Sequence, residues 1–339
     1  MSYTTYTPLA LISVRVSFKD DVVIKDYTAK LVKTLLINGN PRLEELFSKG
    51  RGLPPKPIHI TPLYATVAEG GRSKKEAIYT RYVAGSDTVK PPPIEKLKPV
   101  KIQGGKEYLF YTGVSLNLLN EVLAGLSNVG RLSFGRSTVY VDNLKYEVSY
   151  LDVGRKVEEV RKALNSSGQL KAVFESPTLL RDPLTPYKSR FRLLVPLPEA
   201  VLAVPLLMCL LDLGRYRLSL FIKLALCIRS SLSMSYSATR TTRVIWYVYD
   251  GKLLPAMVGY VKYYLNTDAV KRASVRLQDK YNLDFLDIIA KAIAISEIYG
   301  VGSGRASGFG HSSWHIARSS KDSLADENLK TGKPSSENF

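Results

Sequence analysis

The stretch Gly300–Gly310 contains five glycines and one arginine within eleven residues. Glycine adopts backbone conformations that other residues avoid, and its missing side chain lets another group approach the backbone closely. Successive backbone N–H groups in such a loop can bind an anion. Glycines also mark ordinary turns, so a tight connection without a ligand is the alternative interpretation.

The residues on either side of this stretch predict a helix before it and a strand after it. Apolar residues repeat at helical spacing in 283–293, and residues 309–315 alternate as a half-buried strand does. A dinucleotide-binding loop has the opposite order, and its third glycine would stand where this chain has Arg305. The sequence therefore does not favour a Rossmann-type site.

The charge balance narrows the class of partner. The chain has 339 residues and a net charge of +18, with a pI near 9.7. Such a balance favours polyanionic partners, and nucleic acid fits better than a membrane because no basic amphipathic helix with exposed aromatics stands out. The two cysteines, the lack of a signal peptide and a longest apolar run of only 200–213 favour a reduced, cytoplasmic protein.

The first half of the chain reads as strand, helix, two strands, helix and strand, the ferredoxin-like order. The expected strands are 8–18, 57–67, 107–114 and 139–151, and the expected helices are 27–37, 43–47 and 116–126. Residues 69–99 are rich in Lys, Gly and Pro and predict an exposed excursion. His59 lies within an expected strand, where a packed histidine is the more frequent outcome.

The second half repeats this order without a residue-level repeat. Its expected strands are 171–180, 243–249, 256–265 and 309–315, with helices in 199–233 and 283–293. The predicted fold class is therefore α+β, with two tandem ferredoxin-like (RRM-like) domains and a C-terminal glycine-rich loop. We expect the domains at residues 1–154 and 155–318, with partial helix in the polar boundary region 154–168, followed by a disordered polar tail at 319–339.

Four stretches of the chain carry a resemblance to a known family. They are Asn40–Leu43, Lys56–Leu63, Phe174–Leu180 and Tyr299–Gly310. In order and spacing they resemble the CRISPR-associated endoribonucleases of the sixth Cas protein family, which cut precursor CRISPR RNA within its repeats. The resemblance implies two ferredoxin-like domains facing each other across a positive cleft. It also implies that the glycine loop contacts RNA.

The family's chemistry, carried over by this resemblance, needs no metal and no cofactor. A ribose 2′-hydroxyl attacks the adjacent phosphate and leaves a 2′,3′-cyclic phosphate and a 5′-hydroxyl. Many members use a histidine after the small helix, where this chain has Ser48. Other members use lysines, and Lys30, Lys33 and Lys56 match those positions, although a solvated helix face is the alternative reading of the first two. Tyr27 and Ser48 are further catalytic candidates.

The resemblance also implies a set of RNA-binding residues, in the basic loop after the small helix and in the glycine loop. They are Lys49, Arg51, Gly300, Gly302, Gly304, Arg305, Gly308 and Gly310. Free lysine has a pKa of about 10.4, so a lysine base at neutral pH would need a depression of about 3 units. Stabilising a developing charge or protonating the leaving oxygen needs no such shift, which favours those roles.

The implied partners are precursor and mature CRISPR repeat RNA, with a CRISPR effector complex and a homodimer as further possibilities. A non-catalytic RNA-binding subunit of the same machinery is the alternative function. The three histidines are scattered and no spaced carboxylate cluster stands out, so the sequence predicts no metal site. His311 and His315 share a strand face after the glycine loop, where RNA contact or a structural role is open.

Overall fold

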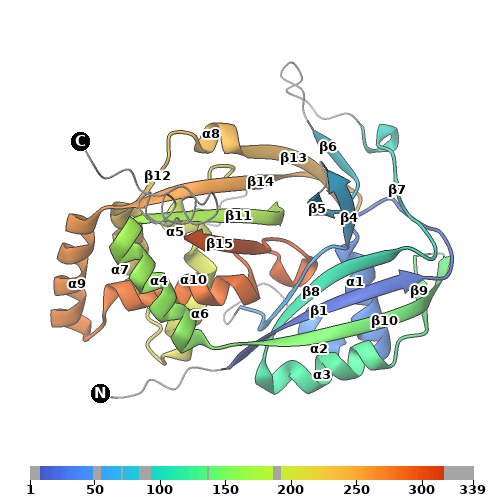
Figure 1. Cartoon of the computed structure of the whole chain (residues 1–339), viewed down its shortest axis with the longest axis horizontal. Coiled ribbons are helices and arrows are strands. Elements are labelled where there is room, and N and C mark those ends of the chain that lie inside the picture. Colours follow the sequence, from blue (N-terminus) through green and yellow to red (C-terminus); the bar gives the residue numbers. More distant parts are fainter. Residues whose placement is uncertain are drawn as a thin grey trace, which may run out of the picture.

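The computed structural model describes residues 8–48, 55–69, 72–83, 93–135, 137–185 and 192–316. Lys49, Arg51 and the expected tail at 319–339 lie outside these residues. Two large antiparallel sheets lie side by side, each with helices on one face, and a small two-stranded sheet accompanies them (Figure 1).

The first sheet has the order β5-β4-β8-β1-β10-β9, with β3 also paired to β8. Alternate residues of its central strand β1 are fully buried, since helices α1 and α3 cover that face. The elements up to this point are β1 (Leu9–Phe18), β2 (Val22–Ile24), α1 (Ala29–Gly39), α2 (Leu43–Ser48), β3 (Ile58–Ile60), β4 (Tyr64–Glu69), β5 (Arg72–Ala77), β6 (Arg81–Val83), η1 (Ile94–Lys96), β7 (Val100–Ile102), β8 (Glu107–Ser115), α3 (Leu116–Ser127), β9 (Arg131–Phe134) and β10 (Ser137–Leu151).

The second sheet has the order β15-β11-β14-β13-β6. Its helices pack on one face around α10, which is buried along most of its length. The elements of this half are α4 (Val153–Ser167), β11 (Gln169–Thr178), α5 (Pro198–Val201), α6 (Ala203–Asp212), α7 (Leu218–Ser231), β12 (Leu232–Met234), α8 (Ala238–Thr241), β13 (Thr242–Tyr249), β14 (Lys252–Leu265), α9 (Thr267–Tyr281), α10 (Phe285–Tyr299), η2 (Arg305–Ser307) and β15 (Ser312–Ile316).

Both sheets confirm the expected tandem ferredoxin-like fold. Counting the four strands of the β-α-β-β-α-β order in each half, the fourth strand pairs with one edge of the first strand and the third strand pairs with its other edge. The order is β10-β1-β8-β4 in the first sheet and β15-β11-β14-β13 in the second. The expected strand at 57–67 is wrong in one respect, since Thr61–Leu63 interrupt it and leave β3 and β4 as separate strands. The polar stretch at 154–168, expected to be helical in part, belongs to one continuous helix, α4.

The two halves share packing as well as a chain connection. Strand β6 leaves the first half and pairs with β13 of the second sheet. Six buried residues from the second half join the core beneath the first sheet, namely Leu179, Ile245, Tyr247, Ala256, Ala306 and Phe309. The glycine-rich stretch 300–310 therefore lies where the two cores meet. Each helix in the described part falls short, in length or apolar content, of what a bilayer-spanning segment requires.

Candidate functional site

The glycine-rich stretch packs tightly against the first half of the chain. Gly308 has φ +94°, and a Cβ atom there would lie 2.2 Å from Cβ of Ala29 and 2.8 Å from the Tyr27 ring. At Gly310, with φ +78°, a Cβ atom would lie 1.9 Å from the carbonyl oxygen of Val301. Close approach of backbone to backbone and to helix α1 is therefore one reason why these two positions are glycine.

Most N–H groups of this stretch already donate within the protein. Those of residues 300, 301, 303, 307, 308, 309 and 310 donate to backbone carbonyls, including Ser303 to Leu179 (2.8 Å) and Gly310 to Pro177 (3.0 Å). Gly304 is exposed, whereas the other four glycines of the stretch are buried or lie against neighbouring backbone. The surface that another molecule can reach is thus centred on Gly304, flanked by the half-buried Ser303.

Arg305 points inward and not toward solvent. Its side chain is 5% exposed and donates to the carbonyl oxygens of Tyr299 (2.9 Å) and Lys56 (3.1 Å). Burial lowers the pKa of this guanidinium to about 10. The arginine therefore ties the glycine stretch to the backbone of Lys56, one of the lysines singled out from the sequence.

Tyr27 is fully buried at the start of α1. Its hydroxyl donates to the carbonyl oxygen of Gly308 at 2.7 Å, and its ring stacks on Phe309 with 4.6 Å between centroids. Burial raises the pKa of this phenol well above its ordinary value. In this arrangement the hydroxyl is committed to holding the glycine stretch against α1.

The structure separates Lys30 from the other two lysines. Its Nζ atom forms ion pairs with Asp26 and with Asp250, both at 2.5 Å, and lies over the Tyr249 ring. Although desolvation lowers the pKa of Lys30, the bonds to Asp250 and Asp26 raise it above the ordinary value overall. Because Asp250 belongs to the turn between β13 and β14, Lys30 links the two halves of the chain.

Lys33 and Lys56 meet at the C-terminal end of the small helix α2. The Nζ atom of Lys33 lies 5.4 Å from the centre of the Phe47 ring, and that of Lys56 donates to the Phe47 carbonyl oxygen. Burial, and then the charge of Lys33, lower the pKa of Lys56. Ser48 ends α2 beside them, is exposed, and donates to the carbonyl oxygen of Glu45 at 3.1 Å. The ammonium groups of Lys33 and Lys56 and the hydroxyl of Ser48 therefore all lie at the C-terminal end of α2, a corner of the molecule.

A buried histidine pair lies behind the glycine stretch. His59 Nδ1 lies 3.1 Å from the carbonyl oxygen of Arg305 and therefore donates, so His59 Nε2 accepts from His311 Nδ1 at 3.2 Å. Burial lowers the pKa of both rings. The packed role expected for His59 is confirmed, and His311 is buried while His315 is exposed. Sequence reasoning could not find this pair, because 252 positions separate its members.

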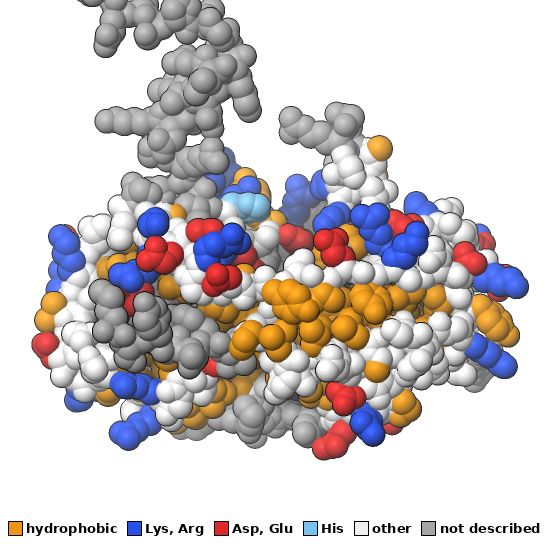
Figure 2. Space-filling view, turned by 60° about the horizontal axis from the view of Figure 1, so that its bottom comes forward, with side chains coloured by type: hydrophobic (Ala, Val, Ile, Leu, Met, Phe, Trp, Pro, Cys, Tyr) orange, Lys and Arg blue, Asp and Glu red, His pale blue; other side chains and the backbone are white. Residues whose placement is uncertain are grey.

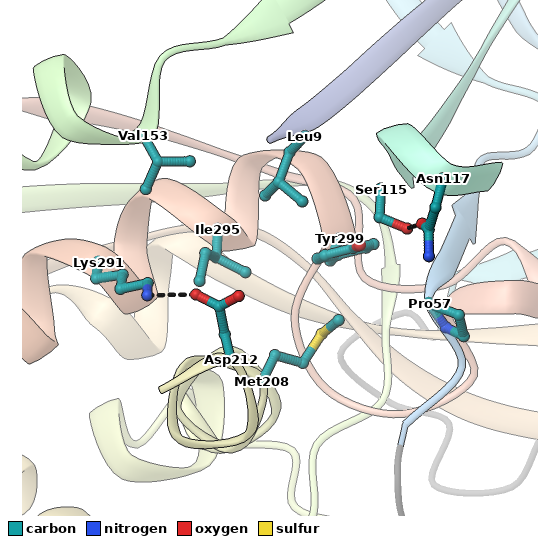
Figure 3. Close-up of a pocket in the computed structure, with 10 residues that line it drawn as sticks. All are labelled: Leu9, Pro57, Ser115, Asn117, Val153, Met208, Asp212, Lys291, Ile295 and Tyr299. Carbon is teal, nitrogen blue, oxygen red and sulfur yellow. Dashed lines mark hydrogen bonds and ion pairs between the residues drawn. The ribbon is translucent and has the colours of Figure 1, made fainter. Parts of the chain in front are cut away.

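A cavity of about 210 Å³ lies between the two halves, next to the Pro57 that follows Lys56 (Figure 3). Its lining is mostly apolar, and it includes the ion pair between Lys291 of α10 and Asp212 of α6, 2.5 Å apart. Within the described ranges, no group of three or more His, Cys, Asp or Glu side chains is placed to hold a metal ion.

The part of the chain that carries α1, α2 and β3 also matches a known family. Residues 10–83 match the family model of the Cas6 N-terminal domain. The whole fold agrees, since a Cas6 product complex matches with a TM-score of 0.52 and 15% identity, covering 92% of this chain and 100% of that one. Together these matches show that residues 10–83 resemble the Cas6 N-terminal domain and that the whole chain shares the Cas6 fold. The resemblance seen in the sequence is thereby confirmed.

Other Cas6 structures share the fold at similar distance. A Cas6 from Thermus thermophilus matches with a TM-score of 0.50 and 14% identity, covering 92% of this chain and 99% of that one. A partial Cas6-RT-Cas1–Cas2 complex matches with a TM-score of 0.52 and 13% identity over 93% of this chain and 47% of that one. No curated protein sequence matches the chain. At these identities the structures establish a shared Cas6 fold.

Proposed function

We propose that this chain is an endoribonuclease that cleaves CRISPR repeat RNA in precursor transcripts. The observation that carries the proposal is the convergence of Lys33 and Lys56 at the end of α2, inside the segment that matches the Cas6 N-terminal domain. Two ammonium groups held in one corner suit a reaction in which a phosphate gains negative charge. The net charge of +18 suits an RNA substrate.

The proposed reaction is attack of a ribose 2′-hydroxyl on the adjacent phosphorus atom, without a metal ion. The new P–O bond closes a 2′,3′-cyclic phosphate as the bond to the 5′-oxygen breaks, and that oxygen takes a proton. Lys56 is the proposed proton donor, because burial, and then the charge of Lys33, lower its pKa and make its ammonium a better acid. Lys33 is proposed to stabilise the charge on the non-bridging oxygens.

The Lys56 Nζ atom donates to the Phe47 carbonyl oxygen. An incoming phosphate offers a charged acceptor in place of a neutral one, and hydrogen bonds to charged groups are about twice as strong. We propose that Lys56 turns from this carbonyl oxygen to the phosphate when the RNA binds. Ser48 is proposed to contact the same phosphate, and Lys49 and Arg51 follow it directly in the chain.

The glycine stretch is proposed to bind RNA through its exposed corner at Gly304. Arg305 and Tyr27 are proposed as positioning residues, because their polar atoms bond to the backbone of Lys56 and Gly308. The other glycines are proposed to set the backbone conformation of the stretch, namely Gly300, Gly302, Gly308 and Gly310. Lys30 is proposed to hold the two halves together through its ion pair with Asp250.

Single-turnover cleavage of a labelled repeat RNA in excess EDTA tests the proposal. We expect cleavage at one site with a cyclic phosphate end, and no cleavage when the attacking 2′-hydroxyl is replaced by hydrogen. Lys33→Ala and Lys56→Ala should each slow cleavage by at least about 10²-fold, the scale for one positioned electrostatic group. Lys162→Ala, an exposed lysine on α4, is the matched control. Wild-type rates in both variants would refute the catalytic assignment.

The same assay separates this function from the alternative, a non-catalytic RNA-binding subunit. Tight binding of repeat RNA without any cut would favour the subunit.

Within either function, we propose domains at residues 1–154 and 155–318. Val157, Val160 and Leu164 of α4 pack in the core of the second half, which supports placing this helix, and so the start of the second domain, near residue 153.

A homodimer is a further proposal, and β10 is the surface on which we place the second copy. Among the described strands β9 pairs only with residues 137–140 of β10, and the Val141 N–H donates to the Gly130 carbonyl oxygen, which leaves the edge at 142–151 open. Tyr146 and Tyr150 on this strand are exposed, and Figure 2 shows a broad apolar area on the face that includes β10 and α3. An open edge can pair with its own copy around a two-fold axis. Sedimentation of wild type and Tyr146→Lys tests this contact, and a wild-type monomer would refute it.

A further inference from the structure

The cavity of about 210 Å³ between the two halves is lined by both of them (Figure 3). Strand β1, the end of β8 and helix α3 line it from the first half, and helices α6 and α10 line it from the second. Leu9, Ile295 and Tyr299 form a buried floor, since none of them is more than 5% exposed. Asn117 and Met208 are at least partly exposed, so solvent reaches the cavity beside them. Small-molecule sites are frequent at such boundaries between domains.

Polar groups stand at two ends of an apolar middle. Figure 3 shows Lys291 and Asp212 on one side of the cavity and Ser115 and Asn117 on the other, with Tyr299 between them. The Lys291 Nζ atom lies 2.5 Å from Asp212 Oδ2, and the lysine side chain is 5% exposed. The Ser115 hydroxyl donates to Asn117 Oδ1. No described residue accepts a hydrogen bond from the amide nitrogen of Asn117, which can therefore donate to a ligand.

The charges at this cavity select an uncharged ligand. Lys291 and Asp212 are the only charged side chains among the described residues that line it, and their charges cancel. Taking a charged ligand out of water is costly unless an opposite charge compensates it, and this pair leaves no net charge to do so. An amide group suits the pair better, because its carbonyl oxygen accepts from the ammonium and its N–H donates to the carboxylate.

The volume limits the ligand to about one ring with small substituents. A dry cavity of about 150 Å³ holds benzene, so about 210 Å³ leaves room for a few further atoms. The side chains of Val153, Met208 and Ile295 give the middle of the cavity apolar walls. The Tyr299 ring offers a face on which a flat ring can stack. A hydrogen-bond acceptor at the far end of such a ring would meet the amide of Asn117.

We propose that this cavity binds a small uncharged ring compound that carries an amide group at one end and a hydroxyl or carbonyl acceptor at the other. The amide lies at Lys291 and Asp212, the ring lies against Tyr299, and the acceptor lies at Asn117. Because the ligand contacts both halves, it binds while they are packed together and stabilises that packing. The site is distinct from the proposed catalytic corner at the end of α2, and it does not depend on the proposed nuclease function.

Isothermal titration of the full chain with 4-hydroxybenzamide tests the site, because this compound carries the amide, the ring and the hydroxyl in that order. We expect one molecule to bind per chain and the unfolding midpoint to rise with its concentration. The compound 4-hydroxybenzoate has the same shape but places a carboxylate beside Asp212, so it should bind at least about tenfold more weakly. Wild type that binds no 4-hydroxybenzamide, or that binds the benzoate as tightly, overturns the inference.

Two variants locate the binding in this cavity. The larger side chain of Met208→Trp crowds the cavity, and overpacking should weaken binding by about 5- to 150-fold. Asn117→Ala removes one hydrogen bond and should weaken binding by about 2- to 12-fold. Leu211→Trp adds a comparable bulk on the same helix but outside the lining, and it should bind as wild type does. Equal affinity of wild type and both cavity variants would place the compound elsewhere and overturn the site.

Repeat RNA separates a free small molecule from a base of the RNA, which also offers an uncharged ring with amide-like edges. We expect saturating repeat RNA to leave the affinity for 4-hydroxybenzamide unchanged. Displacement of the compound by RNA would assign the cavity to an RNA base and overturn the inference. A protein that binds the compound as expected but never cuts the repeat would refute the proposed nuclease and leave this site standing.

Discussion

Gly308→Ala is the most direct test of how the glycine stretch holds the two halves together. The residue has φ +94°, a region that costs other residues about 1–2 kcal/mol. Its new methyl group would also lie 2.2 Å from Cβ of Ala29, which cannot move without shifting helix α1. Overpacking of this kind typically costs about 1–3 kcal/mol. The expected loss of unfolding free energy is therefore about 2–5 kcal/mol.

Gly105→Ala is the matched control for the backbone term. That glycine has φ +72°, but a Cβ atom there would meet nothing within 4 Å. Its substitution should cost only the conformational part, about 1–2 kcal/mol. Urea unfolding of both variants at equal protein concentration measures the difference. If Gly308→Ala loses no more stability than Gly105→Ala, the contact between the stretch and α1 does not contribute, and the argument for a lock at this position is wrong.

Three further outcomes can be measured on the same protein. The cleavage rate should fall at alkaline pH as Lys56 loses its proton. Burial and the charge of Lys33 lower the pKa of Lys56, so Lys33→Gln should move this fall in rate to higher pH. A pH profile that does not move would argue against Lys56 as the acid. Binding of single-stranded RNA through about 4–6 phosphates should give a slope of log K against log salt near −3 to −4, and a slope near zero would refute a mainly electrostatic contact. Lys30→Ala should slow cleavage less than tenfold but lower the free energy of unfolding, because Lys30 forms ion pairs with Asp26 and Asp250. A loss of cleavage rate as large as that of Lys56→Ala would contradict this.

Local patterns were sufficient for most of the helices and strands. Apolar periodicity predicted β1, α1, α3 and β10 to within a few residues, because hydrophobic alternation is a property of near neighbours in the chain. The same reasoning missed α9, whose charged residues and short apolar stripe give a weak signal. It also merged β3 with β4, since the apolar run continues through the break at Thr61–Leu63 while the backbone leaves the strand conformation.

The chemistry of the individual site residues was decided by contacts between distant segments. Lys30 and Lys33 lie three residues apart in the sequence and look alike there. In the structure, however, Lys30 forms an ion pair with Asp250, whereas Lys33 lies over the Phe47 ring near the end of α2. The resemblance implied that Arg305 binds RNA, and in the structure its side chain is buried and donates to the carbonyl oxygens of Tyr299 and Lys56.

The amino-acid sequence by itself determined the fold class and the basic character, since these follow from composition and local periodicity, and the list of candidate site residues came from the resemblance of its motifs to a known family. The tertiary structure decided which N–H groups, lysines and histidines form hydrogen bonds or ion pairs within the protein. Tyr27 and Gly308 meet across 281 positions, and His59 and His311 across 252. A hydrogen bond or ion pair depends on atoms being within about 3–4 Å, and separation along the chain carries no information about that distance.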